Sequence, residues 1–316
     1  MTIIDDSQNP PMVEAFFDQT SNTVSYLIHD AATGAAAIID PVLDFDHNSG
    51  RLATASADHL LARVEELNLQ LAYVLETHAH ADHMSAGHYL RVKTGAKLAI
   101  GEKITEVQQV FAPIFEADDV SFDGVAFDRL LSDGETLPLG TNTIQVVHTP
   151  GHTPACVCYK IGDAIFVGDT LFMPDFGTAR CDFPGGDAAT LYASIQKILA
   201  FPDNMRVFTC HDYLPKGRDE YIWESSIAEQ RRSNIHIGGK SEEEFVAMRS
   251  TRDKTLAAPK LILPSLQVNI RAGTLPPAEA SGAVFLRLPV NAFPGFEHTS
   301  DALQAKVEDF QPDWHI

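Results

Sequence analysis

The stretch LAYVLETHAHADH, residues 71–83, decides how the chain folds and where its chemistry lies. Its first half is a short apolar run, which predicts a buried strand. Its second half holds three histidines and one aspartate within six residues. Because residues two apart in an extended segment point the same way, His78 and His80 can reach one ion together. Asp82 and His83 follow, where we expect the chain to turn into a helix. Without a metal, so many polar side chains at a strand end would carry a heavy desolvation cost.

Three further polar residues each follow an apolar run that predicts a buried strand. His152 in TPGHT follows IQVVH, Asp169 in FVGDT follows AIFV, and His211 in TCHDY follows RVFT. Binding sites in proteins that alternate strands and helices commonly lie where strands end. We therefore predict that these residues and residues 78–83 form one metal site. A histidine outside such motifs is more often structural, and we expect this of His29, His47, His59, His88, His148, His236, His298 and His315.

The first two thirds of the chain alternate strand patterns with helix patterns. Residues 12–40 predict a β-meander that turns at Thr33-Gly34 and ends at Asp40-Pro41. Residues 58–69 predict a helix with Asp58 as its N-cap, and residues 84–94 predict a helix that stops at Gly95. Further strands are expected at residues 97–101, 144–148, 164–167 and 206–209. This alternation predicts an α/β protein.

The pattern changes after residue 219. The run DEYIWESSIAEQRR, residues 219–232, has acids at its start and arginines at its end, which suits a helix dipole. Ser241 and Glu244 form a predicted capping box for the next helix. Beyond Pro259 we expect a more extended chain. We predict a single domain over residues 1–316, with residues 236–316 as an extension packed on the core.

The composition is that of an ordinary soluble globular protein, with 45% hydrophobic and 21% charged residues among 316. The net charge of −20 repels phosphate backbones and anionic lipid, so we expect neither nucleic-acid nor membrane partners. Cys156, Cys158, Cys181 and Cys210 have spacings that suit neither disulfides nor structural zinc. The acidic start of the sequence lacks the features of a signal peptide, and no apolar run approaches the ~18 residues of a membrane span. A cytoplasmic location is expected.

The motifs THAHADH, TPGHT, GDT and HDY, in that order, resemble those of the metallo-β-lactamase superfamily. The resemblance implies a four-layer αββα sandwich with metal at one edge. Two branches of the superfamily share the first motif and act on thiol compounds. Glyoxalase II is a binuclear hydrolase of glutathione thioesters, and the persulfide dioxygenases are mononuclear iron enzymes that convert glutathione persulfide to sulfite and glutathione. All the ligand positions of both branches are filled here, so the ligand set does not choose between them.

Other segments are more similar to the dioxygenases. FGTARCDFPGGDAATLYASI, residues 176–195, resembles a dioxygenase segment whose core here is Arg180-Cys181-Asp182-Phe183. HDY is also similar to the dioxygenase form, whereas glyoxalase II more usually has a glutamate after this histidine. LPSLQVNIRAGTLPP, residues 263–277, resembles a longer bacterial type of persulfide dioxygenase, and related bacterial proteins are described as β-lactamase-like hydrolases.

For the dioxygenase, the resemblance implies one Fe(II) held by His78, His152 and Asp169, with a low-molecular-weight persulfide and O₂ as substrates. Two histidines and one carboxylate leave coordination positions open for both. Arg180 and Tyr213 would hold the substrate. The groups that would orient ligands or water by hydrogen bonds are His80, Asp82, His83 and His211. In the shorter enzymes an arginine helps hold the glutathione carboxylate, and in a rough alignment His236 takes its place here. The resemblance therefore implies the iron site more strongly than it implies glutathione as the preferred thiol.

Two other interpretations remain open. In a thioester hydrolase of glyoxalase II type, His80, Asp82, His83 and His211 would be true ligands, and two zinc ions about 3.5–4 Å apart would activate a bridging hydroxide. A non-catalytic binding or sensor protein is disfavoured, because it has no chemical reason to retain so many costly polar groups. A homo-oligomer is also open, because members of the superfamily often form dimers or tetramers.

Overall fold

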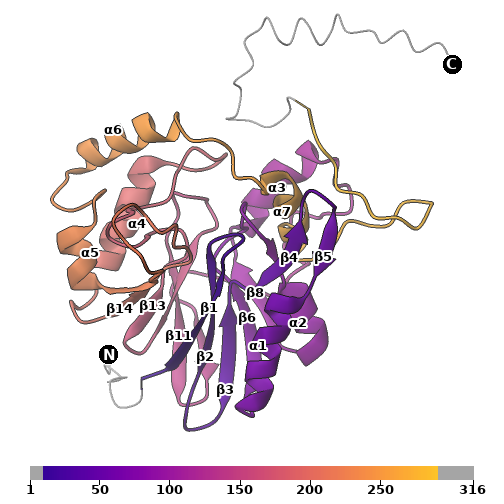
Figure 1. Cartoon of the computed structure of the whole chain (residues 1–316), viewed down its shortest axis with the longest axis horizontal. Helices are drawn as coiled ribbons and strands as arrows, with labels where there is room; N and C mark the ends of the chain where they lie inside the picture. Colours follow the sequence, from indigo (N-terminus) through magenta and orange to yellow (C-terminus); the bar gives the residue numbers. More distant parts are fainter. Residues whose placement is uncertain (1–9, 291–316) are drawn as a thin grey trace, which may run out of the picture.

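The computed structural model describes residues 10–290, so His298, His315 and the last part of the predicted extension lie outside the described residues (Figure 1). Two six-stranded sheets form the centre of the molecule. The first sheet contains, in spatial order, β1 (Met12–Asp18), β2 (Thr23–His29), β3 (Ala35–Ile39), β6 (Gln70–Glu76), β8 (Lys97–Gly101) and β9 (Arg129–Leu131). The second contains β10 (Thr136–Leu139), β11 (Asn142–His148), β12 (Val157–Ile161), β13 (Ala164–Phe166), β14 (Arg206–Phe208) and β15 (Glu224–Ser226). A small third sheet joins β5 (Arg51–Ala53), β4 (Val42–Asp46) and β7 (Met84–Ser85).

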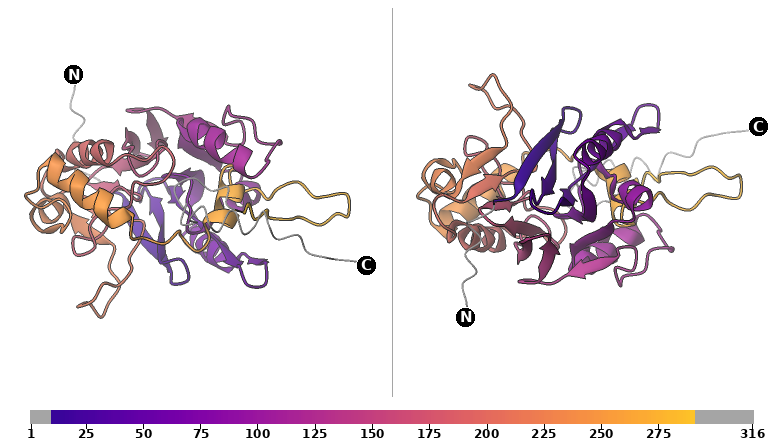
Figure 2. Two further views of the ribbon diagram at one scale, coloured as in Figure 1. Left: turned by 90° about the horizontal axis from the view of Figure 1, so that it is seen from above. Right: turned by 90° about the horizontal axis from the view of Figure 1, so that it is seen from below.

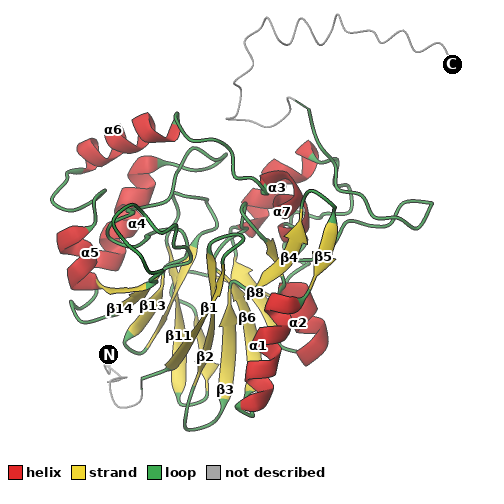
Figure 3. Cartoon of the chain, viewed as in Figure 1, coloured by secondary structure: helices red, strands yellow, loops and turns green. Residues whose placement is uncertain are grey.

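Helices cover the outer faces of both central sheets, as Figures 2 and 3 show. The first sheet is covered by α1 (Ala55–Glu66), α2 (Gly87–Thr94), α3 (Ile104–Ile114) and α7 (Ile262–Asn269). The second is covered by α4 (Ala188–Leu199), α5 (Ile227–Ser233) and α6 (Glu242–Asp253). A third hydrophobic cluster, which contains Tyr26 and Phe166, lies between the two sheets. The predicted αββα sandwich is therefore confirmed.

Strand β6 shows why the apolar run in residues 71–75 folds as it does. It pairs in parallel with β3 on one side and β8 on the other. Successive side chains of a strand point to opposite faces, so Val74 packs towards the helices while Leu75 packs between the sheets. A strand that is buried on both faces needs a continuous rather than an alternating apolar run. It ends at Glu76, and the polar motif follows directly.

Several predicted turns and caps are confirmed. Gly34 and Gly95 both have positive φ angles, of 74° and 77°. At Gly95 this left-handed residue ends α2, and its N–H donates to the carbonyl of Arg91. Ser241 and Glu244 form the capping box at the start of α6.

Besides α2, which begins at Gly87 because Met84 and Ser85 form β7 instead, three predicted elements are wrong in their bounds or type. Helix α1 begins at Ala55 with Thr54 as N-cap, and Asp58 instead accepts hydrogen bonds from the side chains of Thr54 and Tyr89. Residues 219–232 do not form one helix. Their middle part is β15, which pairs with β14 and forms the edge of the second sheet, and only α5 is helical because Ser226 caps it.

The segment after Pro259 is the third correction. Residues Ile262–Asn269 form α7 rather than an extended chain. Pro264, Ser265, Val268 and Asn269 have low helix propensity, so the sequence alone gives little helical signal here. Burial of Ile262, Leu266 and Val268 in the cluster that covers the first sheet stabilises the helix. Within residues 10–290, no helix has the length and apolar character needed to cross a lipid bilayer. The four cysteines are buried and form no disulfide.

Candidate metal centre

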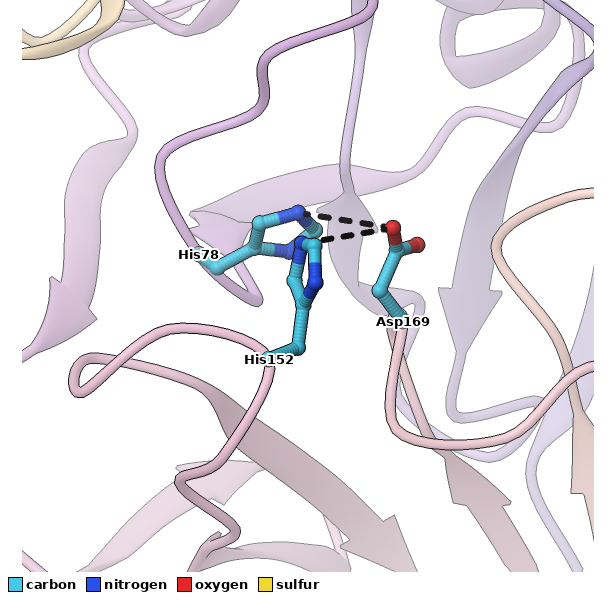
Figure 4. A group of neighbouring side chains, drawn as sticks. All are labelled: His78, His152 and Asp169. Atoms are coloured by element: carbon cyan, nitrogen blue, oxygen red, sulfur yellow. Dashed lines mark ion pairs between the residues drawn. The ribbon is translucent and has the colours of Figure 1, made fainter. Parts of the chain in front are cut away.

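The loops that follow β6, β11, β13 and β14 bring distant polar residues together at one end of the sandwich. Figure 4 shows His78, His152 and Asp169 pointing toward one another. The Nε2 atoms of His78 and His152 lie 3.9 Å and 3.6 Å from Asp169 Oδ2. Metal ligands that each lie about 2.0–2.2 Å from one ion are separated by such distances. The three side chains are therefore placed to share a cation.

A second group adjoins the first through Asp169. His211 Nε2 lies 3.2 Å from Asp169 Oδ1 and 3.4 Å from Asp82 Oδ2. The potential ligand atoms of His80, Asp82 and His83 also lie within 4.8 Å of one another. The structure thus brings all the predicted metal-site residues into one cluster, and Asp169 lies between its two halves.

Hydrogen bonds fix the tautomer of three of these histidines. The ring Nδ1 of His78 lies 3.0 Å from Thr77 Oγ1, that of His152 lies 2.7 Å from the carbonyl of Arg180, and that of His211 lies 3.1 Å from the carbonyl of Asn22. A carbonyl can only accept, so Nδ1 carries the proton in His152 and His211. In each ring Nε2 is left facing Asp169, at the position where a metal would lie.

Several buried polar atoms of the cluster make no hydrogen bond to any described residue. They are His78 Nε2, His80 Nδ1, His83 Nε2, Asp169 Oδ1 and His211 Nε2. Each such atom costs free energy in a protein interior unless it finds a partner. The concentration of these atoms at one point fits a bound metal ion, which would satisfy them together.

The protein's electrostatics favour the charge states that a metal binds. Burial lowers the pKa of His78 far below its usual value, and the charge of His80 lowers it further, so the ring is neutral. Burial alone would raise the pKa of Asp169, but the charge of His211 lowers it overall. Conversely, despite the opposing effect of burial, Asp82 and Asp169 raise the pKa of His211 to about 9. Asp169 is therefore ionised at neutral pH, and a metal at His211 would displace a proton.

Sequence reasoning missed Asp40, which lies beneath the cluster. Its carboxylate accepts hydrogen bonds from the Thr77 N–H at 2.7 Å, the Thr77 hydroxyl at 2.8 Å and His80 Nε2 at 3.0 Å. Because the Thr77 hydroxyl donates to Asp40, it must accept from His78 Nδ1, which fixes the tautomer of that ring too. Asp40 also has a positive φ of 49°, an uncommon conformation for a non-glycine residue. The signal was present, because AIID is another buried strand that ends in an acid.

Glu76 is a second residue that the sequence did not single out. Its side chain accepts a hydrogen bond from the Ser85 hydroxyl, and its Oε2 lies 3.3 Å from His80 Nε2. Burial raises the pKa of this carboxyl group. His80 therefore differs from the other rings, because its Nε2 faces two carboxyl groups, of Asp40 and Glu76, rather than Asp169.

A cavity of about 510 Å³ opens onto the cluster at His152, Asp169 and Asp82. Aromatic side chains form much of its wall: Phe172, Phe176, Phe183 and Tyr213. A molecule of modest size could therefore reach the metal position past a largely apolar wall.

Comparison with known proteins agrees with this geometry. Residues 19–211 match the Metallo-beta-lactamase superfamily. The chain belongs to this superfamily. It is an enzyme of the superfamily, either a hydrolase or a dioxygenase, and its histidine and aspartate cluster is consistent with a metal cofactor.

Relatives within the metallo-β-lactamase superfamily carry different names. A probable metallo-hydrolase of Burkholderia pseudomallei strain 1710b is 52% identical over 89% of this chain and 99% of its own length. Glyoxylase B2 of Dictyostelium discoideum is 47% identical over 90% of this chain and 98% of its own. Human mitochondrial persulfide dioxygenase ETHE1 is 30% identical over 85% of this chain and 91% of its own. The crystal structure of ETHE1 from Myxococcus xanthus aligns with a TM-score of 0.67 and 33% identity, over 83% of this chain and all of that one.

Among the predicted substrate residues of this superfamily member, Arg180 lines the cavity but already has partners. Its guanidinium forms two hydrogen bonds to Asp182, at 2.6 Å and 2.7 Å, and a third to the carbonyl of Ala257. Its charge is therefore balanced by a neighbouring carboxylate, and its role in holding a substrate stays a prediction. Tyr213 also lines the cavity, where it stacks on His211 and Phe176 and is 38% exposed.

His236 lies behind the cavity wall rather than in it. It is buried, and its Nδ1 accepts a hydrogen bond of 2.9 Å from the N–H of Thr178, a residue that lines the cavity. Burial lowers the pKa of His236 to about 4, and the charge of Arg249 adds to the effect, so the ring stays a neutral acceptor. His236 therefore supports the wall and cannot replace an arginine that contacts substrate.

Proposed function

We propose that this chain is a mononuclear non-haem iron dioxygenase that oxidises glutathione persulfide, or a similar small persulfide, to sulfite and thiol. The observation that carries the proposal is the triad of His78, His152 and Asp169, two histidine rings and one carboxylate around one point. Two histidines and one carboxylate are the ligand set of non-haem Fe(II) oxygenases. The cavity opens onto His152 and Asp169, so substrates can reach the metal position from the cavity.

Similarity to named dioxygenases supports the proposal. Human persulfide dioxygenase ETHE1 and the Myxococcus xanthus ETHE1 structure both align with more than four fifths of this chain. The more similar relatives include proteins named as a probable metallo-hydrolase and as Glyoxylase B2, so names alone support both reactions. The Arg180-Cys181-Asp182-Phe183 segment and the HDY motif at residues 211–213 favour the dioxygenase, whereas the triad fits both reactions.

The proposed overall reaction is RSSH + O₂ + H₂O → RSH + SO₃²⁻ + 2 H⁺. Ferrous iron, when bound, would supply the electrons for O₂ activation and an open position for a soft sulfur anion. The chain's own residues fix the ligands. Thr77 and the Arg180 carbonyl orient the rings of His78 and His152, and the aromatic wall excludes water from the reacting sulfur.

Cations near the cavity entrance suit a substrate with a carboxylate. Arg252 and Lys260 line the cavity, are exposed, and form no ion pair within residues 10–290. Arg180 and Arg249 also line it but are paired with Asp182 and Asp253. On a protein with a net charge of −20, this placement favours an acidic substrate over a neutral one. We therefore propose that Arg252 and Lys260 attract the substrate's carboxylate.

Oxygen consumption tests the proposal directly. Protein loaded anaerobically with Fe(II) should consume O₂ only when glutathione persulfide is added, and sulfite should form in equal amount. Metal analysis should give one iron per chain. The His78→Ala variant serves as the control, since it removes one ligand. Thioester cleavage with no O₂ uptake, by a protein that holds two zinc ions, would refute the proposal.

One observation favours the thioester hydrolase as a second candidate. His80, Asp82 and His83 form a separate potential ligand group, and His211 links it to the triad, because its Nε2 lies 3.4 Å from Asp82 Oδ2 and 3.2 Å from Asp169 Oδ1. Two metals bridged by Asp169 could activate a water molecule for hydrolysis. Hydrolysis of S-lactoylglutathione by the zinc-loaded protein distinguishes this candidate, because the dioxygenase predicts none.

A further inference from the structure

The metal loop, residues 77–83, is held by a side chain from α7, almost two hundred residues later in the chain. Asn269 is the last residue of α7 and is 4% exposed. Its Nδ2 donates to the carbonyl of His80 at 2.7 Å and to the carbonyl of His83 at 2.8 Å. Its Oδ1 accepts from the N–H of Ser85 at 2.8 Å. One amide thus contacts the loop at its middle and its end.

Only an amide in this orientation satisfies all three backbone groups. Two carbonyl oxygens need donors, and one N–H needs an acceptor, which matches the NH₂ and C=O of asparagine. A carboxylate of the same shape would place an acceptor against two acceptors. The contact therefore depends on the chemistry of Asn269 and not only on its size.

Asn269 is itself held firmly by its neighbours. Gln108 of α3 donates to the carbonyl of Ile270 at 2.9 Å, and Arg271 forms two hydrogen bonds to Asp119. Gly273 has a φ of +81°, and a Cβ there would lie 2.9 Å from the carbonyl of Ser85. The segment from Asn269 to Gly273 is therefore fixed by α3 and Asp119, and it packs closely against Ser85, just after the metal loop.

The metal loop needs such support because it has no helix or strand of its own between β6 and β7. His80 and His83 are each 1% exposed, and a buried carbonyl without a hydrogen bond is costly. Fixing two carbonyls also fixes the backbone that carries His80, Asp82 and His83. We propose that Asn269 is a positioning residue that holds the metal loop in its metal-binding conformation before the metal arrives.

This inference does not depend on which metal the protein uses or which reaction it catalyses. The experiment measures metal affinity rather than turnover, so it can fail while the proposed oxidation stands, and the reverse also holds. The full chain is freed of metal and titrated with Co(II) against a chromophoric chelator. The visible spectrum of bound Co(II) reports the coordination geometry.

Gln267, on the same helix, offers a matched control. It is also buried, and its amide also makes three hydrogen bonds, two from Nε2 to the carbonyls of Leu263 and Arg287 and one from the Arg287 N–H to Oε1. None of them reaches the metal loop. Gln267→Glu and Asn269→Asp thus both replace a buried amide by a carboxyl group. The Asn269 amide contacts the metal loop, and the Gln267 amide does not.

Asn269→Asp should weaken Co(II) binding by about 10–100-fold, the usual loss when a residue that orients metal ligands is changed. It should also alter the Co(II) spectrum, whereas Gln267→Glu should leave both within about threefold of wild type. Wild-type affinity and spectrum in Asn269→Asp would overturn the inference, as would an equal loss in both variants. Thermal unfolding of the metal-free proteins checks that each folds. If Asn269→Asp does not fold, Asn269→Ser replaces it, and unchanged Co(II) affinity in that variant has the same meaning.

Discussion

Two regions next to the cavity differ in whether their buried polar groups have hydrogen-bond or ion-pair partners. The cavity's metal floor consists of His78, His152, Asp169 and His211. Its charged wall consists of Arg180 and Arg249 with their partners Asp182 and Asp253, and His236 lies behind this wall. In the metal floor, the Nε2 atoms of His78 and His211 have no hydrogen bond. In the charged wall, each arginine pairs with a carboxylate, and His236 accepts from Thr178.

We infer that the unpaired groups serve to bind a ligand, whereas the paired groups stabilise the fold. Unpaired polar atoms lower stability unless a ligand completes them, so their removal should not destabilise the metal-free protein. Paired buried charges are strongly destabilising when one partner is lost, because the other stays buried alone. The two regions should therefore respond oppositely to mutation.

The largest effect is expected at the metal floor. His78→Ala should abolish metal binding and lower activity by far more than about 100-fold, because a direct ligand matters more than the residues that orient it. The melting temperature of the metal-free protein should stay within a few degrees of wild type. Metal analysis and calorimetry check this together. A large loss of stability in the metal-free variant would break the comparison.

A large effect of the other kind is expected in the charged wall. Arg249→Met leaves Asp253, which is 4% exposed, without its partner, and should lower the free energy of unfolding by about 3–5 kcal/mol. Urea unfolding measures the change. Adding Asp253→Leu should recover much of the loss, since no buried charge then remains unpaired. A single variant as stable as wild type would contradict the assignment.

A change at Asp40 tests whether a residue beneath the metal floor contributes to metal affinity. Asp40→Asn keeps the shape but replaces one acceptor oxygen by an NH₂ group, which places a donor against donors, so the hydrogen bonds from Thr77 and His80 weaken. Metal affinity should fall by about 10–100-fold. Competition with a chelator measures it, and Asp44→Asn, at a carboxylate that binds Ser56 away from the metal cluster, is the control.

The pH dependence of stability sharpens the role of His236. Burial and the charge of Arg249 lower its pKa to about 4 in the folded protein, from about 6.5 when unfolded. Between pH 6.5 and 4 the unfolded state therefore binds a proton that the folded state does not. The free energy of unfolding should fall by about 1 kcal/mol for each unit by which the pH is lowered over this range. His236→Asn should flatten this part of the curve. Melting temperatures at several pH values test this, and an unchanged slope would remove His236 from the explanation.

The smallest effect is expected at the cavity entrance. Arg252→Ala should raise KM for a persulfide with carboxylates by about two- to fivefold and leave kcat unchanged, because an exposed charge contributes about 0–1 kcal/mol. The KM for an uncharged persulfide should not change. Added salt should reduce the difference between variant and wild type. Equal effects on both substrates would exclude an electrostatic role.

The sequence alone predicted the α/β class, from the alternation of strands and helices, and the residues that gather in one cluster, whereas the αββα sandwich came from the family resemblance. Apolar runs that end in histidine or aspartate indicate the cluster, since a strand buried on both faces and a costly polar group at its end are local patterns. The capping box at Ser241 and the glycine stop at Gly95 were predictable for the same reason. Asp40 had a similar pattern, although a single acid before proline gives a weaker signal than THAHADH.

Only the tertiary structure decided what the remaining residues touch. Residues 219–232 have a helical charge pattern, but pairing of β15 with β14 outweighs it over the middle of the segment. The pairing of Arg180 with Asp182, the burial of His236 and the contact of Asn269 with the metal loop follow from how separate segments pack. Hydrogen bonds between residues far apart in the chain leave no periodic trace in it, because each depends on the position of a backbone group that the fold places there.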